Sequence, residues 1–314
     1  MRVAILVMFC VLSGCDRYRD FTLPPQTPGV KKLTVDWLPR PEPVLSPGAP
    51  GSWDAVDVLN PSVLKVPGGF FSLYSGFDGQ IWRTGSATSP DGFTWKKLGP
   101  VLSPSGPDRY IAANGSVIEF HGARRHYYQV GRTPSIVLDG QPVLQPGPYG
   151  SWDERGVADP YAIALSGKLY LYYLGMDRAR RQRLGLAVSD DGVAWYKLRS
   201  NPVLELGGYG AFDENGLGEP AVWASHNSYW MLYTGRARNE KRRLGIARSP
   251  DGVHWSRLPQ VFEGAQPWNS QVLCDPTVVV EGDRIRVWFG GGDVPRPDEN
   301  LHGQIGYAEL RIHP

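Results

Sequence analysis

The chain repeats itself, and this repetition limits the possible folds more than any other feature of the sequence. The motif Gly-x-Ala-x-Ser-x-Asp-Gly-x-x-Trp occurs three times, at residues 85–95, 185–195 and 245–255. The apolar residues before each Asp-Gly alternate, as on a half-buried strand, and Asp-Gly is typical of the two-residue turn of a β-hairpin. Each copy therefore predicts two antiparallel strands, the second of which resumes at the Trp.

A second motif occurs five times. An Asp or Asn lies six positions before a second polar residue, which Pro or Gly follows. A short apolar strand comes next, and then a strand rich in Tyr, Phe and Trp. The second polar residues, which we expect to open the first strand of each repeat, are Asn60, Asn114, Asp159, Glu219 and Asp275.

Five repeats of four strands predict an all-β fold, a five-bladed β-propeller. The second repeat is degenerate, because we expect no Asp-Gly hairpin after Gly131. The last repeat lacks a fourth strand, and the segment from Trp37 to Leu45 matches the strand that other repeats have at that place. We therefore expect this N-terminal strand to pair with Gln304–Leu310 and close the last blade. A β-sandwich is the alternative, and the fivefold repetition argues against it.

Charge and composition exclude several classes of protein. The chain has 33 Lys and Arg against 31 Asp and Glu, a net charge of +2, so we expect no nucleic-acid partner. It has no P-loop, no His-Glu-x-x-His and no paired Cys-x-x-Cys, and its six His residues show no ligand spacing. The sequence therefore predicts no metal site and no cofactor.

The first 15 residues resemble a bacterial lipoprotein signal. A short apolar run precedes Leu12-Ser13-Gly14-Cys15, which is similar to a lipobox. We therefore expect signal cleavage before Cys15, lipidation of Cys15, a flexible tether over residues 16–31 and a propeller domain over residues 32–314. An ordinary secretory signal is the alternative. The expected location is the bacterial cell envelope, lipid-anchored and facing the periplasm, with the choice between inner and outer membrane open, and the expected state is a monomer.

The five polar residues of the second motif are candidates for chemistry. In a propeller the first strand of every blade begins on one face near the axis, so these side chains converge. Three carboxylates in one narrow mouth repel each other, so at least one pKa should rise. A protonated acid beside ionised partners is what glycosidic cleavage requires. The alternative is that these groups cap turns and bind water in a polar channel.

Arginines and aromatic residues are candidates for binding. The hairpins that join the second and third strands are basic, and Arg132, Arg178 and Arg236 lie at or next to the ends of second strands. Guanidinium groups suit an anionic ligand, either an acidic or phosphorylated glycan or inorganic phosphate. Solvated hairpin tips are the alternative. Trp53 and Trp152 are candidates for stacking on sugar rings, with packing between blades as the alternative.

The repeats, the Ser-x-Asp-Gly-x-x-Trp hairpins and the acidic-Pro dipeptides resemble the five-bladed propeller glycosidases over residues 37–310. These are glycoside hydrolase families 43, 62, 32 and 68, with the mannoside phosphorylases of family 130. The resemblance implies that Glu219 is the general acid and that Asp159 orients it. Hydrolases of these families have a carboxylate where this chain has Asn60, so Asp57 or Asp275 would activate water. Family 130 carries Asn-Pro there and uses phosphate.

The sequence thus predicts a glycoside hydrolase-like envelope lipoprotein that cleaves or remodels a carbohydrate. Phosphorylase-type cleavage, a non-catalytic glycan-binding propeller and a scaffold for polysaccharide assembly are the alternatives. Some members of the resembling group hold a central calcium ion or a water cluster, to which Asp275 and Asn114 would contribute here.

Overall fold

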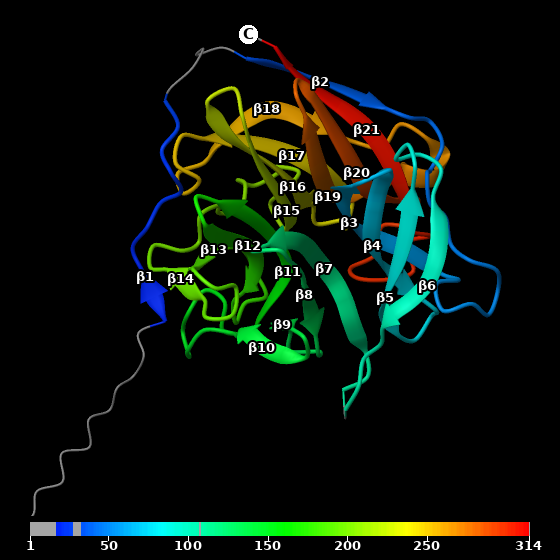
Figure 1. Ribbon diagram of the computed structural model, residues 1–314, viewed down its shortest axis with the longest axis horizontal. Helices are drawn as coiled ribbons and strands as arrows, with labels where there is room; N and C mark the ends of the chain where they lie inside the picture. The colour runs from blue at the N-terminus through cyan, green and yellow to red at the C-terminus, as the bar shows by residue number, and fades with distance from the viewer. Residues whose placement is uncertain (1–16, 28–32, 107, 314) are drawn as a thin grey trace, which may run out of the picture.

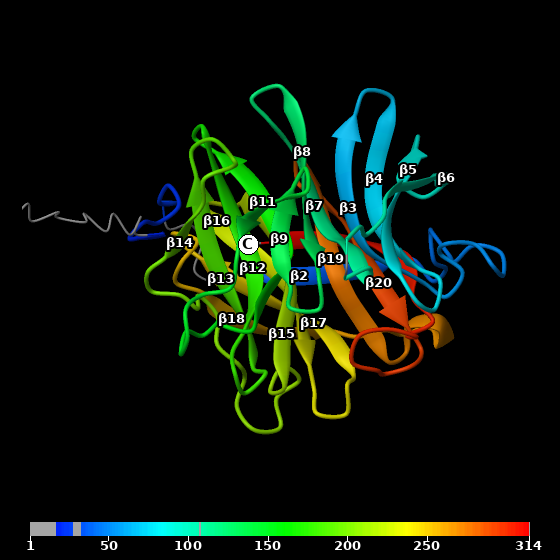
Figure 2. The same ribbon diagram turned by 90° about the horizontal axis from the view of Figure 1, so that it is seen from below.

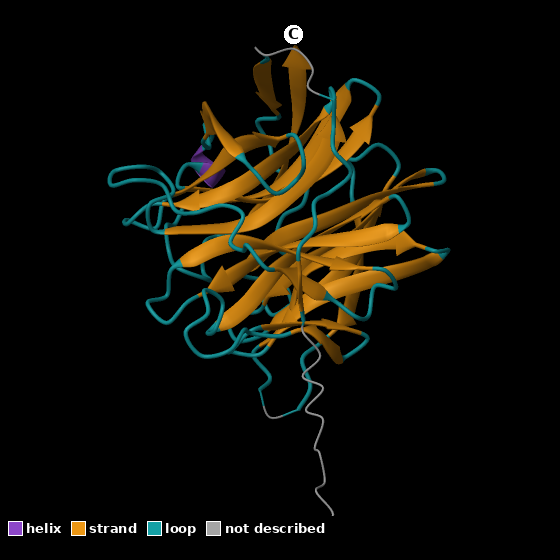
Figure 3. Ribbon diagram, turned by 90° about the vertical axis from the view of Figure 1, so that its left-hand side faces the viewer, coloured by secondary structure: helices purple, strands orange, loops and turns teal. Residues whose placement is uncertain are grey.

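The computed structural model describes residues 17–27, 33–106 and 108–313. These residues form 21 strands and one short 3₁₀ helix, η1 (Pro267–Asn269), so the described chain is all-β, as predicted (Figure 3). Residues 1–16, with the expected signal and Cys15, lie outside the described residues. Within them, no helix has the length and apolar character that crossing a bilayer requires.

Twenty of these strands form five antiparallel groups of four, which we call units one to five. Units one and two comprise β3 (Asp57–Val66), β4 (Gly69–Phe77), β5 (Trp82–Ser89) and β6 (Lys96–Leu102), then β7 (Ile111–Phe120), β8 (Ala123–Val130), β9 (Ser135–Leu138) and β10 (Gln141–Leu144). Units three and four comprise β11 (Gly156–Leu165), β12 (Lys168–Met176), β13 (Gln182–Ser189) and β14 (Tyr196–Leu198), then β15 (Gly216–Ser225), β16 (Ser228–Arg236), β17 (Arg242–Ser249) and β18 (Ser256–Phe262). Unit five comprises β19 (Val272–Glu281), β20 (Arg284–Gly292), β21 (Gln304–His313) and the N-terminal β2 (Thr34–Pro39).

The first strands of the units lie next to one another. β3 contacts β7, β7 contacts β11, β11 contacts β15, β15 contacts β19, and β19 contacts β3 (Figure 1). The other strands of each unit follow outward as twisted sheets, which Figure 2 shows from below. The main apolar clusters lie between neighbouring units, as where Tyr172 and Leu186 of unit three pack with Val222 and Met231 of unit four.

The expected pairing of the N-terminal strand with the last unit is confirmed. β2 runs antiparallel to β21, with Trp37 opposite Leu310. The Trp37 ring also stacks on Phe262 of unit four at 4.9 Å and lies 5.5 Å from Phe289 of unit five. One apolar residue thus joins the N-terminal strand to two units.

Residues 17–27 differ from the flexible tether that we expected. β1 (Tyr18–Arg19) pairs in parallel with β14, and the backbone N–H of Leu23 donates to the carbonyl of Asp251 at 2.9 Å. The Leu23 side chain is fully buried among Tyr172, Tyr229 and other residues of units three and four. This part of the chain is held because Leu23 fills an apolar site between two units.

The Asp-Gly turns also differ from expectation. In the three long motifs the strand ends at the Ser and the next begins after the Trp, so six residues connect them. In unit one Asp91 Oδ1 accepts from the backbone N–H groups of Phe93 and Thr94, each at 2.8 Å. The two-residue turn occurs instead at Asp139-Gly140 of unit two, where both φ angles are positive, at 50° and 75°. Our expectation that unit two lacks such a hairpin was wrong.

Candidate active site

Five polar residues occupy the same place in the five first strands. Each of these strands has ten residues, and the polar residue is the fourth, so it lies inside the strand and does not open it. The ladder shifts register at each of these places, as at a β-bulge. All five residues have a left-handed backbone, with φ from 43° to 52°: Asn60, Asn114, Asp159, Glu219 and Asp275.

The bulge explains both the conformation and the residue that follows. A bulge takes one residue out of the alternation of the strand and turns its side chain, and bulges are common next to active sites. Four of the five are followed by Pro, which has no N–H group and is tolerated at bulges. A left-handed backbone is strained most for Glu219, because Glu lacks the short polar side chain that makes Asn and Asp tolerant.

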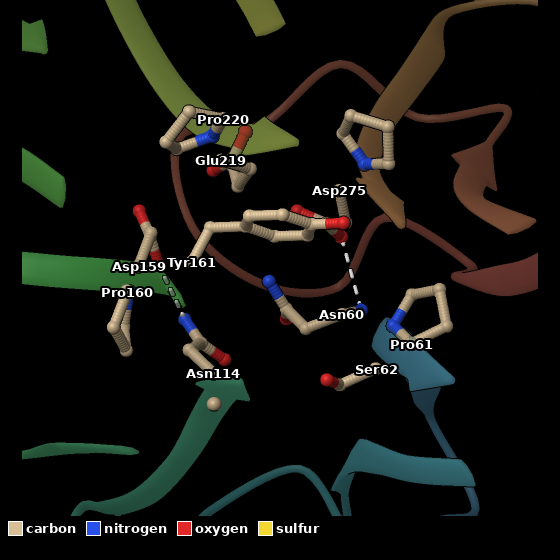
Figure 4. A pocket seen from close by; sticks show the side chains of 12 residues that line it. Asn60, Pro61, Ser62, Asn114, Asp159, Pro160, Tyr161, Glu219, Pro220 and Asp275 are labelled. Carbon is tan, nitrogen blue, oxygen red and sulfur yellow. Dashed lines mark hydrogen bonds between the residues drawn. The ribbon is translucent and has the colours of Figure 1, made fainter. Parts of the chain in front are cut away.

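The five side chains converge, as predicted. All of them line a cavity of about 710 Å³, whose wall also contains the connections between second and third strands. They line a second, much smaller cavity of about 30 Å³ as well, with room for one water molecule. The Tyr161 ring extends across the centre between these side chains (Figure 4). Of these two cavities, only the large one has room for a ligand larger than water.

Two of the three converging acids hold protons more strongly than free carboxyls. Burial, together with the negative charges of Glu219 and Asp275, raises the pKa of Asp159 well above its usual value. Burial and the charge of Glu219 raise the pKa of Asp275 to about 7. The expectation that at least one pKa rises is confirmed.

Hydrogen bonds hold two of the acids and leave one free. Asn114 Nδ2 donates to Asp159 Oδ1 at 3.3 Å, and Asp275 Oδ2 accepts from the Asn60 N–H and the Cys274 thiol, each at 3.2 Å. Glu219 Oε2 is buried and has no hydrogen-bond partner among the described residues. A buried, unpaired oxygen is costly, so this atom is available to a ligand.

The structure separates the three candidate arginines. Arg132 and Arg236 line the large cavity, and Arg236 also pairs with Glu240 at 3.4 Å. Arg178 does not line it, because its guanidinium is held by Glu154 at 2.8 Å and by the Tyr149 hydroxyl at 2.6 Å. Of the three arginines predicted to bind substrate, Arg178 is thus the one that lies outside the cavity wall.

Three further arginines of the cavity were missed. Arg155, Arg180 and Arg242 line it together with Arg132 and Arg236, and five acidic residues line the same cavity: Asp159, Glu219, Glu240, Asp275 and Asp298. Arg180 and Arg242 belong to the basic hairpins that the sequence singles out. The pattern does not show which members of a hairpin face inward, because that depends on the turn conformation.

Asp57 is not part of the cavity. Its carboxylate is fully buried and accepts three backbone N–H groups, from Asn300 at 2.6 Å, Leu301 at 3.1 Å and Gly303 at 2.7 Å. It therefore holds the connection between β20 and β21. The expectation that Asp57 replaces a base at position 60 was wrong.

Trp53 and Trp152 are also absent from the cavity. The Trp152 ring lies over Gly175 and Gly185 of the second and third strands, where a Cβ atom would come within 2.3 Å and 2.5 Å of it. Trp53 covers Gly76 and Gly85 in the same way. These rings therefore pack against the sheets. This agrees better with the alternative of a packing role than with stacking on sugar rings.

No group of three or more His, Cys, Asp or Glu side chains in the described parts of the chain has a metal-site arrangement. Asn114 and Asp275 instead bond to separate partners, Asp159 and the Asn60 N–H. We therefore derive no step from a calcium ion.

The chain is similar to several known proteins. The chain is 26% identical over 226 residues to the uncharacterized protein MT1551 of Mycobacterium tuberculosis (strain CDC 1551 / Oshkosh), with 62% of this chain and 75% of that protein covered. It is 29% identical over 135 residues to the 1,2-beta-oligomannan phosphorylase of Thermoanaerobacter sp. (strain X514), with 40% and 45% covered. The beta-1,2-mannobiose phosphorylase of Listeria innocua has a similar fold, with a TM-score of 0.68, 12% identity, and 88% of this chain and 97% of that chain covered.

A family match covers more than half of the chain. Residues 74–286, about two thirds of the chain, match the family described as "Glycosyl hydrolases family 32 N-terminal domain". The matched region contains the polar residues of units two to five and the hairpins that surround the cavity. The chain therefore belongs to the family of the glycosyl hydrolases family 32 N-terminal domain.

Proposed function

We propose that this protein cleaves a glycosidic bond in the large cavity. The observation that carries the proposal is the meeting of Asp159, Glu219 and Asp275 in one buried mouth, where the pKa of two of them is raised. Glycosidic cleavage needs one carboxyl group that gives a proton and a second group that acts on the sugar. Membership of a glycosyl hydrolase family supports the same reaction class.

Proton transfer is assigned to Glu219 and Asp275 as a pair. The unpaired Oε2 of Glu219 is free to meet the oxygen of the leaving sugar. The pKa of Asp275 is raised to about 7 partly by the charge of Glu219, so the two carboxyls are close enough to interact. Asp275 then activates the attacking water, and Asp159, bonded to Asn114, tunes the charge of the pair.

The test is the variant Glu219→Gln, which keeps the shape of the side chain and removes its ability to transfer a proton. We expect the release of reducing sugar from a panel of neutral and acidic oligosaccharides to fall at least about 100-fold, with affinity nearly unchanged. Asp57→Asn is a matched control, since it alters a buried carboxyl outside the cavity. Glu281→Gln, the same change at a carboxyl that ends β19 and does not line the cavity, is a further control and should leave turnover unchanged. Turnover by Glu219→Gln equal to that of the wild type, or wild-type binding of glycans without cleavage, would overturn the proposal.

Phosphorolysis is a second candidate, and two features favour it. Asn60 stands where a carboxylate is expected, and five arginines line the cavity. Arg242 is only 9% exposed and lies near the charges of Glu219 and Asp275, where it can hold an anion against these acids. In this reaction phosphate replaces water as the nucleophile, so a sugar 1-phosphate forms only when inorganic phosphate is added. The same arginines favour an acidic or phosphorylated glycan as the substrate.

We further propose that the five units form a closed five-bladed propeller that β2 completes. The succession of contacts from β3 through β19 and back to β3, and the pairing of β2 with β21, support this closure.

The proposed location is the bacterial cell envelope, facing the periplasm, with a monomer anchored through lipidated Cys15. The resemblance of residues 12–15 to a lipobox supports this. Cys15→Ser should move the protein from the membrane to the soluble fraction.

A further inference from the structure

Two tyrosines are more exposed than any other large apolar or aromatic side chain of the described residues. Tyr149 is 83% exposed and Tyr209 is 90% exposed. They occupy equivalent positions in the loops that lead into β11 and β15, the first strands of units three and four. Exposed aromatic rings at equivalent places in neighbouring units are unusual, because aromatic residues are normally covered.

The loop itself does not need a tyrosine. Each tyrosine is the second residue of a β-turn that a hydrogen bond closes, from the Ser151 N–H to the Pro148 carbonyl and from the Ala211 N–H to the Gly208 carbonyl, each at 3.0 Å. Unit one has the same turn, and Pro50 is its second residue. Pro is favoured at this position, so the aromatic ring is not required for the turn.

Both rings are supported from one side by an arginine. The Arg178 guanidinium lies 3.9 Å from the centre of the Tyr149 ring, and that of Arg238 lies 4.8 Å from the centre of the Tyr209 ring. These arginines are held in turn by Glu154 at 2.8 Å and by Glu214 at 3.2 Å.

The same glutamates also fix the turns. Glu154 accepts the N–H of Gly150 at 2.6 Å, and Glu214 accepts the N–H of Gly210 at 2.9 Å. Each ring is therefore fixed in place while its other side faces solvent.

The support occurs as a set. Units three and four have all three members of it, whereas unit one has none and carries Pro50, Ala55 and Gly79 at the equivalent positions. In these units the Tyr, the Glu and the Arg are therefore present together or absent together, as we expect of residues that serve one function.

The tyrosines contact two hairpins that also form part of the wall of the large cavity. The turn Asp177–Arg181 joins β12 to β13, and it presents Arg180 to the cavity while Arg178 supports Tyr149. The turn that joins β16 to β17 presents Glu240 to the cavity while Arg238 supports Tyr209. The cavity wall and the two rings thus share the same hairpins.

We propose that Tyr149 and Tyr209 form a platform on which the sugar rings of a long glycan stack after the chain leaves the cavity. The proposal rests on the proposed function and extends it to a substrate class, a polysaccharide or long oligosaccharide whose chain crosses units three and four. Fixed aromatic rings give contact area at low cost in entropy, and each contributes through its flat face.

The test compares glycans of two lengths. Binding of β-1,2-oligomannosides and of oligogalacturonides with two and with eight sugar units is measured by calorimetry, on Glu219→Gln to prevent turnover. We expect the substitutions Tyr149→Ala and Tyr209→Ala together to weaken binding of the eight-unit chain about tenfold, and binding of the two-unit chain less than twofold. Tyr149→Phe with Tyr209→Phe keeps the rings and should restore the affinity. Val193→Ala, an exposed residue at the other end of the strands, is the control.

The outcomes separate this proposal from the proposed function. If the wild type cleaves neither probe but the tyrosines still strengthen binding of the longer chain, the platform stands and the cleavage proposal fails. Equal loss for both lengths, no loss for the eight-unit chain, or no binding of either probe overturns the platform. Protection of Tyr149 and Tyr209 from oxidative footprinting by the eight-unit chain alone is a second, direct measurement.

Discussion

At the scale of single residues, the site depends on a strained backbone position that is used five times. A left-handed Asn or Asp is tolerated, but a left-handed Glu219 is held only because the surrounding sheet fixes it. Burial of ionised acids at these positions also destabilises the fold, as the raised pKa values of Asp159 and Asp275 indicate. The site is therefore built at the expense of stability, as is common in active sites.

This cost predicts a pH dependence. The pKa of Asp275 is raised in the folded state, so folding is favoured while the carboxyl is protonated, and this stability is lost as the pH rises through about 7. We expect the free energy of unfolding to fall between pH 4 and pH 8. Asp275→Asn should raise it at pH 8 by roughly 2 kcal/mol, with little effect at pH 4.

Urea unfolding at the two pH values measures this. Asp57→Asn is an instructive comparison, because three backbone N–H groups bind that carboxylate and would be left less well paired. If Asp275→Asn and the wild type have the same free energy of unfolding at both pH values, the prediction is contradicted.

The sequence predicts the convergence of the five polar residues because it follows from spacing alone. It does not predict which arginines face the cavity. Arg178 and Arg180 are two positions apart in one turn, and only Arg180, which has a left-handed backbone with a φ of 61°, lines the cavity. It also does not predict that Asp57 binds a loop from the other end of the chain, because that contact depends on the closure of distant segments.

At the scale of elements, the segment 17–27 acts as part of the fold. Its composition, rich in Pro and polar residues, favours a flexible tether. The burial of the Leu23 side chain nevertheless holds the segment against units three and four. The short hairpin at Asp139-Gly140 is missed because it lacks most of the long motif. Its two strands have four residues each and lack the Ser and Trp of the long motif, so the pattern is too weak to detect.

Leu23→Ala therefore carries a prediction. The side chain packs beside Gly252 and the Tyr229 region, so its removal leaves a cavity between units three and four. We expect a loss of about 2–5 kcal/mol in the free energy of unfolding, measured by urea denaturation. Leu38→Ala, at a side chain 46% exposed, is the control and should cost far less. Equal effects of the two substitutions would mean that residues 17–27 are a free tether.

At the scale of the whole molecule, the units are held together chiefly across their faces. In addition, the hairpin of one unit accepts a hydrogen bond from the preceding unit, as where the Tyr172 hydroxyl of unit three donates to the Gly252 carbonyl of unit four at 2.7 Å. The Trp288 indole of unit five donates to the Gly92 carbonyl of unit one at 2.8 Å, so the first and last units are joined in the same way. The cavity lies at the centre of this arrangement and contains residues of all five units, so its geometry depends on every junction.

The proposed closure by β2 is the junction that involves the most distant parts of the chain, and a covalent link tests it. Thr34 lies opposite His313 in the β2–β21 ladder, and both side chains are exposed. The pair Thr34→Cys and His313→Cys, once oxidised, would close almost the whole chain into one loop and restrict the unfolded state. We expect the free energy of unfolding to rise by about 2–4 kcal/mol, with cleavage activity unchanged, because the link forms on the outer edge of unit five. The reduced double variant and Thr34→Cys alone are the controls. If oxidation leaves the unfolding midpoint unchanged, β2 detaches before the units separate, and it does not complete the last blade in the way that we propose.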